Sequence, residues 1–190
     1  MCARETRDKA GCLSRFDAHA GVYNATIIDS ELDAIRLTGG GKFTLKNVKM
    51  HSDLLISLRE DFGCTWRGDV EIENVRFFNK REKTFLFGAL FYPHHNFGYQ
   101  AYYPENIRIK NVSLRYPAEL HLFNDVTPGE EYDVTAERVT VKGETIENVN
   151  RMILPKNIEI SDIGENVTKF VISSDSVLAT QLENAMKGNK

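Results

Sequence analysis

The chain has 190 residues, of which 42% are hydrophobic and 27% are charged, and its formal net charge is −3. These values are typical of one globular domain, and the acidic balance argues against a nucleic-acid partner, which needs a basic surface. No apolar run approaches the roughly 20 residues of a membrane-spanning helix, so we expect no membrane partner.

The first twelve residues are polar, and we interpret 1–12 as a cap or a polar segment ahead of the fold. They lack the apolar core of a secretory signal, which argues against direct export. The cysteines Cys2, Cys12 and Cys64 have no C-x-x-C spacing, so we predict free thiols rather than a zinc site or disulfides.

The first predicted strand is LSRFDAHAG, residues 13–21. In a strand, alternate side chains point to opposite faces, so Arg15, Asp17 and His19 share one face and Phe16 lies on the other. The pattern predicts either the working face of a binding site or a solvated edge.

A repeat follows, in which an alternating strand, an Asn or Asp, and a second alternating piece recur. The repeated segments are 23–32, 41–50, 68–77, 105–114, 132–141 and 156–165. Asp29, Asn47, Asn74, Asn111 and Asp162 take equivalent places, whereas Arg138 is the exception in 132–141. Asn and Asp tolerate the left-handed backbone region, so we predict a bend at each, with stacked amides bonded to one another.

Strands of this kind can stack edge to edge, with a rise of about 4.8 Å per rung. We therefore predict an all-β fold, a right-handed single-stranded parallel β-helix over 13–173. An antiparallel sandwich of the same strands is the alternative. The segment 174–190 has apolar residues at helical spacing and predicts a short capping helix.

Between the repeats lies a second family of strands, which in a β-helix form a second sheet. Its members are 13–21, 32–40, 53–63, 84–91, 118–124 and 150–155. Alternation places Phe16, Ile35, Ile56, Leu120 and Leu122 inward. The outward residues are then Arg15, Asp17, His19, Arg36, Ser57, Arg59, Asp61, Glu119 and His121.

These outward residues form the candidate site. Arginine binds a carboxylate through two hydrogen bonds, so Arg15, Arg36 and Arg59 could hold an acidic sugar, together with His121. Asp17, His19 and Asp61 are the candidate acids and bases. Trp66, the single tryptophan, follows a glycine in a predicted loop, where it could stack on a sugar ring or pack against its own fold.

The repeat, with its Asn-bearing strand pairs, resembles the pectate-lyase-like superfamily of parallel β-helix proteins. The resemblance covers most of the chain. It implies the parallel β-helix fold, a polysaccharide partner and a location outside the cell. Arg108, Ile109 and Lys110 match the R-I-K element of polygalacturonases, but the N-x-D, D-D and H-G elements are absent. The Asp cluster that binds calcium in pectate lyases and the R-x-P-x-x-R segment are also absent, so the resemblance carries over no catalytic residue. We expect no cofactor, with calcium as the open alternative although no ligand cluster is evident.

We therefore expect a protein that binds or processes a polysaccharide. In the enzyme hypothesis it is a lyase or a glycoside hydrolase acting on an acidic glycan. The alternative is a noncatalytic β-helix piece of a phage-tail, adhesin or cell-surface protein.

Overall fold

The computed structural model describes residues 14–17, 22–59, 66–90, 102–123, 139–141, 144–146 and 155–172, with single positions between 179 and 186. Its strands are β1 (Ser14–Asp17), β2 (Val22–Leu37), β3 (Gly39–Met50), β4 (Leu54–Arg59), β5 (Trp66–Phe77), β6 (Lys83–Leu90), β7 (Asn106–Leu114), β8 (Ala118–Phe123), β9 (Val139–Val141), β10 (Glu144–Ile146), β11 (Asn157–Ile163) and β12 (Val167–Val171). No helix is delimited in this part of the chain, so the helix predicted over 174–190 is not supported. Most of 174–190, and all of 1–12, lie outside the described residues.

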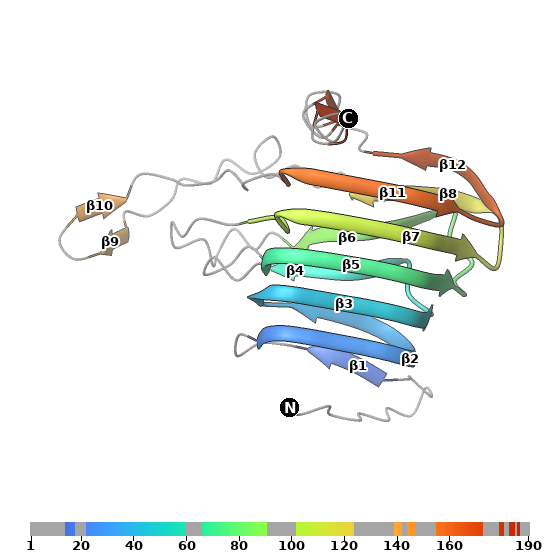
Figure 1. Cartoon of the computed structure of the whole chain (residues 1–190), viewed down its shortest axis with the longest axis horizontal. Helices are drawn as coiled ribbons and strands as arrows, with labels where there is room; N and C mark the ends of the chain where they lie inside the picture. The colour runs from blue at the N-terminus through green and yellow to red at the C-terminus, as the bar shows by residue number, and fades with distance from the viewer. Residues whose placement is uncertain are drawn as a thin grey trace.

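One sheet of parallel strands winds nearly round an axis. Its order is β11-β7-β5-β3-β2-β4-β6-β8-β12, with β1 paired to β2. The long strand β2 pairs with both β3 and β4, so it joins the two branches of the sheet. Figure 1 shows β3, β5, β7 and β11 stacked in one layer with β4, β6 and β8 behind them. Every pair in this sheet is parallel, so the antiparallel sandwich is wrong for these strands.

The predicted bends are confirmed. The backbone φ angles at the repeated position are positive, between 51° and 56°, at Asp29, Asn47, Asn74, Asn111 and Asp162. A side chain at such an angle meets steric resistance that Asn and Asp tolerate best after glycine. The chain therefore turns a corner at the same place in each coil.

The side chains at these corners form the predicted amide ladder. Asn47 donates to Asp29 Oδ1 at 2.8 Å, Asn74 donates to Asn47 at 2.9 Å, and Asn111 donates to Asn74 at 2.8 Å. Each side-chain NH2 group donates to the side-chain oxygen of the residue one coil below. Side-chain bonds therefore fix the register of the coils, as backbone bonds do.

A second ladder, of charges, crosses the outer face of the sheet. Lys42 on β3 lies 2.8 Å from Glu71 on β5, and Arg108 on β7 bonds both Glu71 at 3.1 Å and Glu159 on β11 at 2.8 Å. The R-I-K element is thus a rung of a structural ion-pair ladder, and the two carboxylates raise the pKa of Arg108. Because these groups are exposed, each pair contributes little to stability.

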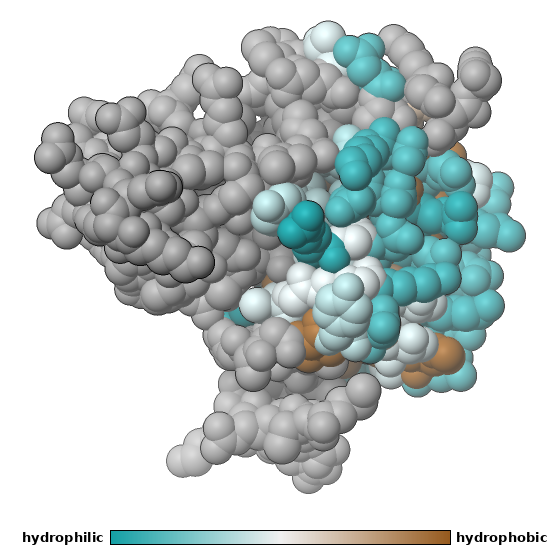
Figure 2. All heavy atoms as spheres, turned by 60° about the vertical axis from the view of Figure 1, so that its left-hand side comes forward, coloured by the Kyte–Doolittle hydropathy of each residue, from teal (hydrophilic) through white to brown (hydrophobic). Residues whose placement is uncertain are grey.

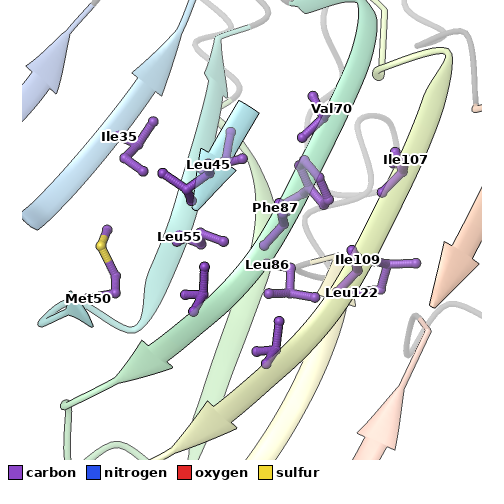
Figure 3. Close-up of a cluster of buried hydrophobic side chains, with 14 of the residues drawn as sticks. Ile35, Leu45, Met50, Leu55, Val70, Leu86, Phe87, Ile107, Ile109 and Leu122 are labelled. Carbon is purple, nitrogen blue, oxygen red and sulfur yellow. The ribbon is translucent and has the colours of Figure 1, made fainter. Parts of the chain in front are cut away.

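The core lies between the two branches of the sheet. Figure 3 shows buried side chains from β3, β5 and β7, such as Leu45, Val70 and Ile109, gathered with Leu55 and Leu86 from β4 and β6. Burying a side chain of this size contributes roughly 1.5–3 kcal/mol each relative to exposure. Apolar burial therefore supplies the main driving force for stacking the coils.

One predicted rung is absent from the stack. The segment 132–141 contributes β9, which pairs antiparallel with β10 in a separate two-stranded sheet. β7 instead pairs directly with β11, with Asn106 opposite Asn157. The departing segment is the one that has Arg138 where the other segments have Asn or Asp, so a residue suited to the bend is missing there.

Candidate functional site

The predicted face is partly assembled. The register places Asp17 beside Arg36 and Arg36 beside Ser57, on three successive strands, as the alternation predicted. Phe16, Ile35 and Ile56 form the neighbouring row. The two rows of the first rungs are therefore the ones that alternation predicted.

This face does not continue as an open polar surface. Ser57 is 9% exposed, and its hydroxyl is buried without a hydrogen-bond partner. The same row carries Leu55 on β4 and Leu86 on β6, which are fully buried and belong to the core shared with β3, β5 and β7 (Figure 3). β4 and β6 are thus covered on both faces, and a groove open to a sugar does not lie over these residues.

The prediction put His121 and Ile56 on opposite faces, but the register puts them on the same face. The register sets His121 opposite Phe85 and Phe123 opposite Phe87, so these residues follow the row of Ile56. Leu120, opposite Thr84, belongs to the other face. Alternation within β8 puts Glu119 and His121 on one face and Leu120 and Leu122 on the other, but it does not tell how β8 lines up with β4.

The environment of His121 explains how a histidine fits there. Its side chain is 2% exposed, its Nε2 lies 3.0 Å from a Glu119 carboxylate oxygen, and its ring lies 5.1 Å from that of Phe85. The hydrogen bond from His121 is the main cause that lowers the pKa of Glu119. The His121 ring is therefore buried away from any glycan, whereas the Glu119 side chain is 34% exposed.

Trp66 is not a loop residue. It begins β5, its side chain is fully buried, and its ring meets that of Phe43 edge to face at 5.8 Å. The indole Nε1 donates to the Asp69 carbonyl at 3.2 Å. The prediction that Trp66 stacks on a sugar is therefore wrong, and the other interpretation, packing against its own fold, holds.

The remaining predicted residues stay untested. His19 and Asp61 lie outside the described residues, and for Arg15, Asp17 and Arg59 the structure describes strand positions and no side chain. The strand register thus places Asp17, Arg36 and Ser57 side by side, and it is the strand positions alone that show this.

A different concave surface lies where the strands of the first layer begin. It is a groove of about 690 Å³, and the described residues that line it are Val22, Tyr23, Gly39, Gly40, Gly41, Arg67, Gly68, Asp69 and Glu105. Four successive coils contribute to it. In Figure 2, where this side comes forward, pale residues lie among hydrophilic ones on the described surface.

Glycines form the floor of the groove. Gly39, Gly41 and Gly68 have φ angles of 139°, 82° and 135°, where side chains are strained. A Cβ at Gly39 would overlap the Val22 backbone, and one at Gly68 would overlap the Gly41 backbone. The backbones therefore lie close together, and the Tyr23 ring lies over the glycines, 3.2 Å from where a Cβ on Gly41 would be.

Tyr23 and Arg67 stand at the two sides of this floor. Tyr23 pairs in register with Gly40, which pairs with Arg67, so the two side chains are two rungs apart with a glycine between them. Two rungs correspond to about 9.6 Å. Tyr23 is 78% exposed, and the Arg67 guanidinium lies 5.0 Å from the centre of the Tyr102 ring.

The acidic residues of the groove already have partners. Asp69 Oδ1 accepts a 2.6 Å hydrogen bond from the Asn106 amide, and Glu105 lies 2.9 Å from the Lys156 ammonium group. Asp69 and Glu105 form the polar side of the groove. Their remaining oxygen lone pairs can still accept a hydrogen bond from a ligand hydroxyl.

Sequence reasoning missed this groove. Its one local signal was the run Gly39-Gly40-Gly41, which alternation cannot place on a face because glycine has no side chain. Arg67 and Tyr23 are 44 positions apart, and only the strand register brings them to one row.

No protein-family model, curated protein or solved structure matches this chain. In the part of the chain that the structure describes, no helix is long and apolar enough to cross a membrane. Among the same residues, no three His, Cys, Asp or Glu side chains are grouped so as to hold a metal ion.

Proposed function

We propose that this protein is a right-handed parallel β-solenoid of the pectate-lyase-like kind that binds a polysaccharide in the groove between Tyr23 and Arg67. The single observation that carries the proposal is an exposed aromatic ring set two rungs from a guanidinium, across a floor of glycines.

Sugars are recognised by this combination of groups. A pyranose ring presents an apolar face that packs on an aromatic side chain, while its hydroxyl and carboxylate groups take hydrogen bonds in the plane of the ring. Tyr23 offers the aromatic face, Arg67 offers several donors, and Asp69 and Glu105 offer acceptors. Tyr23 lies against Gly40 and Gly41, and it is still 78% exposed, so most of it is accessible to a sugar.

The proposal is one of binding. Proton transfer to a glycosidic oxygen, or removal of a proton from a uronate, needs an acid or base free to act. In the groove, Asp69 and Glu105 are each held by a partner within the coil stack. A noncatalytic solenoid that displays a glycan site therefore agrees best with the described residues.

Titration calorimetry with neutral and uronate-containing oligosaccharides tests this function. We expect Tyr23→Ala to weaken binding by about tenfold, the value of one aromatic contact, and Tyr23→Phe to retain most of the affinity. Ile28→Ala removes another exposed apolar side chain of β2, 49% exposed, and should leave binding unchanged.

Two results would contradict the proposal. One is that no neutral or acidic oligosaccharide binds the wild-type protein. The other is that Tyr23→Ala binds as tightly as wild type, as Ile28→Ala is expected to do.

A further inference from the structure

A basic and aromatic ridge lies at the other end of the strands from the groove. Where the chain leaves β3, β5 and β7, His51, Phe78 and Arg115 stack one above another. The His51 and Phe78 rings are 5.5 Å apart, and the Arg115 guanidinium lies 5.3 Å from the centre of Phe78. Backbone bonds from Phe78 to Met50 and from Arg115 to Phe77 hold this column in register.

Further cations surround the upper part of the column. Arg76 lies 5.9 Å from the Phe78 ring, and both Lys80, at 5.4 Å, and Arg115, at 5.6 Å, lie over Tyr116. We define the basic ridge as Arg76, Phe78, Lys80, Arg115 and Tyr116. Its three cations come from two coils and converge on two rings.

Charge on the ridge is only partly neutralised. Arg76 lies 3.7 Å from Glu165, which is 78% exposed, and the adjacent Arg81 lies 3.8 Å from Asp53. Within the described residues, Lys80 and Arg115 contact aromatic rings and no carboxylate. Lower down, Glu31 contacts both His51 and Lys49 and balances that end. A surplus of positive charge at Lys80 and Arg115 is thus local, in a chain whose net charge is −3.

We propose that the basic ridge binds the anionic groups of an acidic polysaccharide, its sulfates or carboxylates. The aromatic rings hold the cations in place, which lowers the entropy lost when an anion binds. Arginine and lysine then present donors to charged oxygens along a chain.

A nucleic acid fits this surface less well. Single-stranded binding uses open aromatic faces on which bases stack, whereas the faces of Phe78 and Tyr116 carry cations. An acidic glycan suits the ridge better, because its charged oxygens need the cations and not open aromatic faces.

The test compares two double variants that remove the same charge. Lys80→Gln with Arg115→Gln removes the two ridge cations, and Lys46→Gln with Lys110→Gln removes two lysines from β3 and β7. Heparin, polygalacturonate and a 20-base-pair DNA duplex are the probes, with binding measured at several salt concentrations. Urea unfolding midpoints show that each variant is folded.

We expect wild type to bind at least one of the two glycans, with an affinity that falls as salt rises. The ridge variant should bind roughly tenfold or more weakly, since two charged contacts are lost, and the control should stay within about twofold. Equal losses in both variants, tighter binding of the duplex, or no glycan binding would overturn the proposal. The ridge variant should bind neutral oligosaccharides in the groove as tightly as wild type does, which separates this site from the groove.

Discussion

Asn74 lies directly above Asn47 in the stack, and its side-chain amide donates a 2.9 Å hydrogen bond to the Asn47 carbonyl oxygen. Asn74 in turn accepts a 2.8 Å bond from Asn111 and has a φ angle of 55°. The Asn74 side chain thus links its coil to the coils below and above it. Its tolerance of positive φ also allows the backbone to bend at this position.

Replacing this residue separates the two roles. Asn74→Gly keeps the bend and loses two side-chain hydrogen bonds, so we expect a loss of about 2 kcal/mol in the free energy of unfolding. Asn74→Ala should cost about 1 kcal/mol more, because alanine is strained at positive φ. Urea titration measures both values.

Asp162 supplies the control for Asn74. It has the same backbone geometry, with φ 56°, and forms no ladder bond among the described residues. Asp162→Ala should therefore show the cost of the bend alone. If Asn74→Gly unfolds at the wild-type urea concentration, the ladder does not stabilise the fold.

Gly68 tests the close approach of backbones under the groove. A Cβ there overlaps the backbone of Gly41, and φ is 135°, so Gly68→Ala should destabilise the protein by about 3 kcal/mol. At Gly164, a Cβ would meet the Ser113 Cβ at 3.3 Å, a contact that a small shift relieves. Thermal unfolding should show a large fall in Tm for Gly68→Ala and a small one for Gly164→Ala; equal falls would contradict the packing described.

Trp66 makes the core visible in solution. As the single tryptophan, fully buried, it should emit at short wavelength in the native protein and resist quenching by acrylamide. We expect Trp66→Ala to cost about 3–5 kcal/mol in stability, the range for removing a large buried aromatic ring. An emission at the wavelength of a solvent-exposed indole, easily quenched before unfolding, would place Trp66 at the surface and refute its assignment to the core.

Glu119 predicts a pH dependence of stability. Because the hydrogen bond from His121 lowers the pKa of Glu119, the ionised carboxyl favours the folded state. This contribution is complete above the usual pKa of a glutamate and is lost as pH falls through the lowered value. Urea unfolding from about pH 6 to about pH 3 should show a shallower loss of stability in Glu119→Gln than in wild type.

Glu82, an exposed glutamate in the turn before β6, provides the comparison for Glu119. Glu82→Gln should follow the wild-type pH curve. If Glu119→Gln also followed the wild-type pH curve, the pairing of Glu119 with His121 would be refuted.

Local chemistry determined much of this fold from the sequence alone. The alternation of apolar residues predicted the strands, and the recurring Asn or Asp predicted left-handed bends and stacked amides. Both follow from near neighbours, since period-2 alternation and the tolerance of positive φ belong to a few residues at a time.

Tertiary structure decided what depends on register between coils. His121 and Ile56 were predicted on opposite faces, and only the pairing of β8 with β6 and of β6 with β4 shows that they share one. Trp66 was placed in a loop, although it begins a strand of the core. The groove between Tyr23 and Arg67 arises because parallel backbone pairing brings residues from distant parts of the chain into one row, a relationship that no local pattern contains.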